Sequence, residues 1–142
     1  MGLVRLTNLD LTGNNNITKD GIKNLVNLTS LNLGSESRIS VDGLENLVNL
    51  TSLTLWGNSL ISEDGLAILV NLTSLDIRSN GQITNDGVKN LVNLTSLNLW
   101  NNRKITDGGL VNLVNLTSLT LGTNNRIFLT REDYRMRGPM SG

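Results

Sequence analysis

One heptapeptide recurs at a fixed interval along this chain and limits its possible folds more than any other feature. The string LVNLTSL begins at residues 25, 47, 69, 91 and 113, so each start lies 22 residues after the last. A diverged copy, LVRLTNL, begins 22 residues before the first of these, at residue 3. We therefore interpret residues 3–127 as six repeats starting at 3, 25, 47, 69, 91 and 113, and residues 128–142 as a C-terminal tail or partial cap.

Each repeat combines two hydrophobic periods. Apolar residues at 31 and 33 alternate with polar residues at 30 and 32, which is typical of a strand. Residues 18–26 predict a short helix, with Thr18 suited to the N-cap, Asp20 to the first turn, and Ile22, Leu25 and Val26 on one face. A glycine recurs early in each such helix, where a small residue permits close packing between repeats: Gly21, Gly43, Gly65, Gly87 and Gly109. Because one repeat cannot cover its own apolar face, we expect the repeats to stack around one continuous core.

An asparagine recurs three residues after the last apolar residue of the predicted strands. A buried asparagine amide at such a place can satisfy the turn backbone of a neighbouring repeat. We predict a structural ladder made of Asn14, Asn58, Asn80, Asn102 and Asn124. Repeat two carries Glu36 instead, so we expect the ladder to be interrupted or remodelled there.

The combined pattern, L-x-x-L-x-x-L-x-L-x-x-N-x-x-I repeated every 22 residues, resembles the leucine-rich-repeat family. The resemblance implies an α/β repeat solenoid, a curved stack with a parallel β-sheet on the concave face and short helices on the convex face. It also implies protein binding, which is what most members do. The period is similar to that of the internalin class. The I-T-x-D-G-[IV] segment of repeats one and four is similar to the cysteine-containing class, with asparagine in place of cysteine, so both subclasses stay open.

Outward-facing strand positions should form columns across the sheet, because side chains alternate along a strand. The third column holds both tryptophans of the chain with an arginine between them: Thr12, Gly34, Trp56, Arg78, Trp100 and Gly122. A guanidinium between two indoles favours cation–π contacts, and these residue types are enriched in interface hot spots. We therefore predict a partner-binding patch on the concave face, formed by Trp56, Arg78, Trp100, Asp76, Asn98 and Thr54. The alternative is that duplication copied a tryptophan-bearing repeat and that the patch binds nothing.

The composition argues against catalysis and against several classes of ligand. The chain has neither histidine nor cysteine, which removes the usual general base and the usual metal ligands, so we expect no metal and no cofactor. Asp10 and Asp76 would lie roughly 14 Å apart at strand spacing, more than the roughly 5–9.5 Å between glycosidase carboxylates. We predict that the protein is not an enzyme.

Charge and hydropathy give similar expectations about partners. Twelve basic side chains balance twelve acidic ones, so we expect no nucleic-acid partner. The longest aliphatic run, residues 66–70, is too short to span a membrane, and no signal peptide is visible, so we expect a soluble protein without membrane insertion. The repeated N-L-T triplets formally match glycosylation acceptors, but we interpret their asparagines as turn residues between helix and strand.

The leading hypothesis is a non-catalytic scaffold that recognises a protein through its concave face. One alternative is a structural protein that associates end to end into filaments, since both ends of the predicted stack are thinly capped and a head-to-tail contact does not close on itself. Another is a carbohydrate-binding module, since tryptophan faces also stack on sugars.

Overall fold

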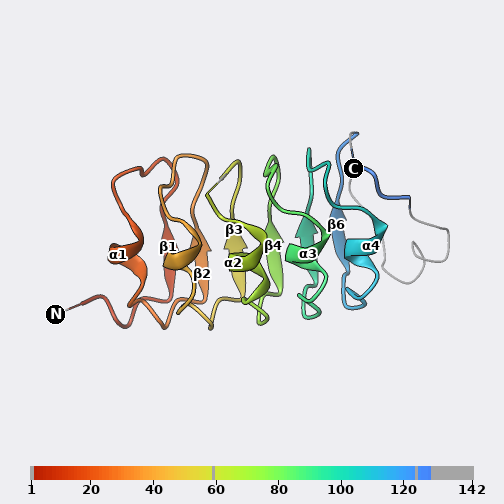
Figure 1. Ribbon diagram of the computed structural model, residues 1–142. Helices are drawn as coiled ribbons and strands as arrows, with labels where there is room; N and C mark the ends of the chain where they lie inside the picture. The colour runs from red at the N-terminus through yellow and green to blue at the C-terminus, as the bar shows by residue number, and fades with distance from the viewer. Residues whose placement is uncertain (1, 59, 124, 129–142) are drawn as a thin grey trace.

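The computed structural model describes residues 2–58, 60–123 and 125–128, and its elements follow one another in a single row from one end of the molecule to the other (Figure 1). Strands and helical turns alternate along the chain in the order β1 (Asn8–Asp10), α1 (Lys19–Ile22), β2 (Ser30–Asn32), the 3₁₀ turn η1 (Val41–Gly43), β3 (Ser52–Thr54), α2 (Glu63–Ala67), β4 (Ser74–Asp76), α3 (Asn85–Val88), β5 (Ser96–Asn98), α4 (Asp107–Leu110) and β6 (Ser118–Thr120).

The strands form one parallel sheet in which each strand pairs with the next in sequence, from β1 to β6. Pairing partners are always equivalent residues of adjacent repeats, as in Leu31 with Leu53 and Leu53 with Leu75. The predicted fold class is therefore confirmed: the chain is an α/β solenoid with a parallel sheet on one side and short helices on the other (Figure 1).

The core lies between the sheet and the helices and is continuous through all the repeats. Its leucine and isoleucine side chains are almost completely buried, and equivalent residues stack from one repeat to the next, as Leu28, Leu50, Leu72 and Leu94 do. Val26 does not join this core, contrary to the expectation that it shares a face with Ile22 and Leu25. Helix α1 ends at Ile22, so the chain has already turned when it reaches Val26, which is 43% exposed.

The recurrent glycines let consecutive helices approach closely, which confirms the prediction. A Cβ atom added to Gly65 would lie 1.9 Å from Val41 Cγ2, and one added to Gly109 would lie 2.6 Å from Asn85 Oδ1.

The helices are only about one turn long. Thr18 occupies the N-cap of α1, as predicted, but its side chain makes no capping hydrogen bond; Thr84 makes one at α3, by accepting from the Asp86 N–H.

Asparagines at the predicted ladder position close their own turn and link it to the preceding repeat. Asn80 Oδ1 accepts from the backbone N–H groups of Gln82 and Ile83, at 3.0 and 3.3 Å. Asn80 Nδ2 donates to the carbonyl oxygen of Asn58, and Asn102 Nδ2 donates in the same way to that of Asn80, at 3.0 Å. The asparagine side chain thus makes the hydrogen bonds that water would otherwise make to backbone groups inside the stack.

The ladder is broken at repeat two, where the turn is shifted by one residue. The left-handed backbone conformation falls on Gly57, Ser79 and Asn101 in later repeats, but on Gly34 in repeat two, one position earlier than the equivalent Ser35. Ser37 is buried there, and its hydroxyl accepts from the Ile39 N–H at 3.2 Å. Within the described residues, the amide nitrogen of buried Asn58 consequently has no hydrogen-bond partner.

At the far end of the ladder, the structure describes the neighbour of the predicted member and not that member itself. Asn124, the expected member, lies outside the described residues. Its neighbour Asn125 donates through Nδ2 to the carbonyl oxygens of Leu99 and Asn102, at 2.9 and 2.8 Å. The predicted C-terminal tail also lies outside the described residues, apart from Phe128.

A second asparagine ladder, which we did not predict, runs along the other edge of the stack. The asparagine of each N-L-T triplet donates through Nδ2 to a valine carbonyl oxygen of the preceding repeat, as Asn49 does to Val26 and Asn71 to Val48, both at 2.9 Å. The threonine of the same triplet donates its hydroxyl to a threonine carbonyl of the preceding repeat, as in Thr51 to Thr29. These triplets therefore have a structural role between repeats, beyond the turn role inferred from the sequence.

The gap at repeat two predicts unequal effects of two otherwise equivalent substitutions. Asn80→Ala removes an acceptor for two backbone N–H groups together with a donor to the preceding repeat, whereas Asn58→Ala removes only the acceptor. We expect both variants to be destabilised, with Asn80→Ala losing about 0.5–1.5 kcal/mol more. Urea unfolding followed by circular dichroism measures the difference, and equal losses would contradict this account of the ladder.

Candidate binding surface

The residues of the third column lie just beyond the strands, in the turns that follow them. Trp56 follows β3 by two residues, and Arg78 and Trp100 hold the same position after β4 and β5. Backbone pairing continues past the strands here: the Gly57 N–H donates to the Arg78 carbonyl at 3.0 Å, and the Ser79 N–H to the Trp100 carbonyl at 2.9 Å. The three side chains therefore come from laterally adjacent backbone.

The arginine pairs with one indole and with the carboxylate of its own repeat. Arg78 Cζ lies 5.9 Å from the centroid of the Trp56 ring, and Nη2 lies 3.1 Å from Asp76 Oδ2. The sequence suggested a guanidinium placed between two indoles, but among the described residues the structure records this stacking for Trp56 alone. Trp100 instead lies close to Gly122, where an added Cβ would be 3.1 Å from the indole Cδ1.

Asp76 and Asn98 hold the backbone that carries the column. Asp76 Oδ1 accepts from the Arg78 N–H at 3.1 Å, and Asn98 Oδ1 accepts from the Trp100 N–H at 3.0 Å. Asn98 Nδ2 also donates to Asp76 Oδ2, at 3.3 Å. These two predicted site residues thus position Arg78 and Trp100, and their oxygen atoms are engaged within the protein.

A groove of about 360 Å³ opens at this place, lined by Trp56, Arg78, Asn98, Trp100 and Thr120. The two indoles are 44% and 51% exposed, respectively. Thr54, another of the predicted site residues, lies between Asn32 and Asp76 in the strand register and does not line the groove. Thr120, which we did not select, does line it. Its place beside Asn98 in the strand register, one repeat further along the chain, is the signal that could have identified it.

The same carboxylate arrangement occurs in the first repeat, without an aromatic residue. Asp10 Oδ1 accepts from both the N–H and the hydroxyl of Thr12, at 2.8 and 2.6 Å. These hydrogen bonds, the hydroxyl above all, lower the pKa of the Asp10 carboxyl, because they favour its charged form. Repeats one, four and five therefore share this turn geometry, and the two tryptophans are what distinguish the groove.

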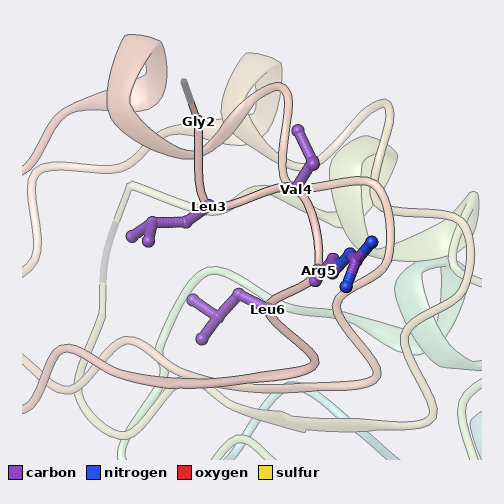
Figure 2. Close-up of a pocket in the computed structure, with 5 residues that line it drawn as sticks. All are labelled: Gly2, Leu3, Val4, Arg5 and Leu6. Carbon is purple, nitrogen blue, oxygen red and sulfur yellow. The ribbon is translucent and has the colours of Figure 1, made fainter.

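A second hollow, of about 610 Å³, lies at the N-terminal end of the stack and is lined by Gly2, Leu3, Val4, Arg5 and Leu6. Figure 2 shows Leu3 and Leu6 extending to one side of the chain, away from Val4 and Arg5. Leu3 is 70% exposed and Val4 53%. The described residues that line this hollow are largely apolar and include no carboxylate.

The part of the chain that the structure describes holds no cluster of three or more acidic, histidine or cysteine side chains able to bind a metal ion. None of the helices in that part combines the length and the apolar character needed to cross a membrane.

Comparison with known proteins supports the reading of the repeats. A family model described as leucine-rich repeat matches residues 6–26, 69–92 and 90–114. The chain is a leucine-rich-repeat protein. Proteins of this family generally act as scaffolds for protein interactions. Comparison with the curated proteins gave no match.

Two solved structures are similar to this leucine-rich-repeat protein. Internalin C2 from Listeria monocytogenes str. 4b F2365 is 30% identical, with a TM-score of 0.71; the match covers 95% of this chain and 59% of that one. The Toll–Spatzle complex from Drosophila matches at 22% identity with a TM-score of 0.54, over 76% of this chain and 18% of that one, and this likeness shows the fold alone.

The one-sided stacking of Arg78 predicts that the two indoles respond differently to its removal. In a Trp100→Phe background, Arg78→Ala should increase acrylamide quenching of Trp56, because the guanidinium no longer covers the ring. In a Trp56→Phe background, the same substitution should leave the quenching of Trp100 almost unchanged. An equal response of the two indoles would contradict the observed geometry.

The lowered pKa of Asp10 predicts a pH-dependent effect of its hydroxyl partner. Because the folded pKa lies below the ordinary value of 3.8, Asp10 stabilises the fold above that value, and this contribution is lost as the pH falls through the folded pKa. Thr12→Val should raise the Asp10 pKa and reduce stability at neutral pH but not at strongly acidic pH. Carboxyl NMR titration measures the pKa, and Thr12→Ser, which retains a hydroxyl, should keep it low.

Proposed function

We propose that this leucine-rich-repeat protein is a non-catalytic scaffold that binds a protein partner through its concave face, at the groove between Trp56 and Trp100. One observation carries the proposal. The only two tryptophans of the chain occupy the same column, are both about half exposed, and line one groove together with Arg78. Tryptophan and arginine are the residue types most enriched in binding hot spots.

The groove combines a large apolar contact with a backbone that is already ordered. The side-chain oxygens of Asp76 and Asn98 accept hydrogen bonds from the backbone N–H groups of Arg78 and Trp100 and so hold these turns, which means that binding would order little backbone. A volume of about 360 Å³ lies in the range of specific ligand sites and accommodates a short segment of a partner rather than a flat face. The ion pair between Arg78 and Asp76 leaves the groove without net formal charge, so apolar contact should dominate the affinity.

The comparisons support this class of function. Leucine-rich-repeat proteins generally serve as interaction scaffolds. Neither relative supplies the partner of this chain, which spans 59% of internalin C2 and 18% of Toll.

The proposal is tested by removing both indoles and comparing partner capture. Trp56→Ala combined with Trp100→Ala should lower the capture of specific partners from a native lysate by at least about tenfold, in line with the loss of two hot-spot residues. Far-ultraviolet circular dichroism should be unchanged, because both side chains lie outside the core. Quantitative mass spectrometry of the captured proteins provides the readout.

A matched control removes two exposed apolar side chains from another surface. Val48→Ala combined with Val92→Ala changes residues that are 50% and 43% exposed on the edge of the stack. This control should capture the same proteins as the unmodified chain. Capture that survives the loss of both tryptophans, or that is lost equally in the valine control, would rule the groove out.

A second candidate function, end-to-end self-association, is favoured by the N-terminal hollow. Its lining is largely apolar, and Leu3 exposes 70% of its surface. Contiguous apolar surface of this kind often marks a contact site, and a head-to-tail contact would continue the stack as a filament. Light scattering over a dilution series, with Leu3→Ser as the variant, would reveal such assembly, and a monomer at every concentration would dismiss it.

A further inference from the structure

We propose that the segment bound in the groove is a proline-rich peptide in the polyproline II conformation, lying across the strands. This inference rests on the proposed function, since it concerns the same groove. It names the chemistry of the partner segment from two independent properties of the site, namely the spacing of its indoles and the state of its hydrogen-bonding groups.

The first argument is the match between two periods. Trp56 and Trp100 occupy equivalent positions two repeats apart, with Arg78 between them. Two steps between neighbouring strands of a sheet span about 9.4–9.8 Å. One turn of polyproline II, three residues long, spans about 9.3 Å. A peptide in this conformation, running along the row of repeats, would therefore present residues i and i+3 to the two indoles without distortion.

The second argument is that the groove offers free hydrogen-bond donors next to side-chain oxygens that already accept hydrogen bonds. Both side-chain oxygens of Asp76 and the side-chain oxygen of Asn98 already accept hydrogen bonds from within the protein. In contrast, neither indole N–H donates a recorded hydrogen bond within the described residues. Among the guanidinium nitrogens of Arg78, the structure records an ion pair there for Nη2 alone. A ligand suited to this groove therefore supplies hydrogen-bond acceptors and carries few hydrogen-bond donors of its own.

A proline-rich peptide has these properties. Proline carries no backbone N–H, and the carbonyl groups of polyproline II make no hydrogen bonds within the helix. The pyrrolidine rings are apolar and fit aromatic-lined grooves, as in other domains that bind proline-rich segments. The conformation is also already extended and stiff, so little entropy is lost on binding. Carbohydrate fits less well, because every sugar hydroxyl brings a donor as well as an acceptor, whereas the carbonyl groups of a proline-rich peptide bring acceptors alone to the free donors of the groove.

The direct test is a titration with synthetic decaproline, followed by tryptophan fluorescence. Because the chain has only two tryptophans and both line the groove, the emission reports on this site alone. We expect a saturable shift of the emission to shorter wavelength as water leaves the indoles. A Gly-Ser peptide of the same length, which has flexible backbone and free amide donors, should produce no saturable shift.

A matched variant tests the spacing itself. Arg78→Trp combined with Trp100→Arg keeps the composition and net charge but places the two indoles on neighbouring repeats, about 4.7–4.9 Å apart. The position two residues after β3, β4 and β5 already holds tryptophan or arginine in this chain, so the fold should be retained, and circular dichroism checks this. We expect the affinity for decaproline to fall at least about tenfold in the exchange variant.

Each other outcome overturns the inference in a recognisable way. If decaproline gives no saturable shift while capture of a lysate partner still depends on Trp56 and Trp100, the proposed function stands and the peptide class is wrong. If the exchange variant binds decaproline as tightly as the unmodified protein, the period match has no role and the inference fails. If a cello-oligosaccharide produces the shift and decaproline does not, the groove binds carbohydrate, and both proposals fail.

Discussion

The structure depends on one constraint: each repeat buries its apolar face only against the repeats on either side. The strands are three residues long and the helices about one turn, so no unit could form a core of its own. In-register stacking joins these small faces into a single core in which equivalent leucines lie in rows. The same register brings equivalent surface residues side by side, and it is therefore responsible for the candidate site as well as for the fold.

Hydrogen bonds between repeats complement this apolar stacking on both edges of the sheet. Asn80 and Asn102 connect the turns after the strands, and Asn49 and Asn71 connect those before them. The shifted turn of repeat two interrupts only the first of these ladders. The strand register on either side of it is unchanged, because the buried leucines keep their spacing. The core therefore specifies the stack, and the asparagines satisfy the backbone groups that stacking places out of reach of water.

The groove shows how such a scaffold acquires a surface of distinct chemistry. A residue two positions past a strand has equivalents in every repeat, so aromatic residues in two repeats and an arginine in the one between them become a continuous patch. Asp76 and Asn98 hold this patch through backbone hydrogen bonds, whereas Asp10 makes the same type of bond beside a threonine. The framework is thus shared by repeats that carry different outward side chains, and the third column is where their chemistry differs.

The 22-residue period was sufficient to predict the sheet, its register, the columns and the close packing at the glycines, because in a stack of equal units the spacing alone decides which residues are neighbours. It could not predict which indole Arg78 covers, that Val26 faces outward, or that the asparagine of each N-L-T triplet donates to the preceding repeat. Nor could it reveal that Asn125 donates at the end of the first ladder. These features depend on side-chain rotamers, on the residue at which a one-turn helix ends and on single-residue shifts within turns. The alternative conformations differ little in local energy, so a periodic sequence pattern cannot distinguish them.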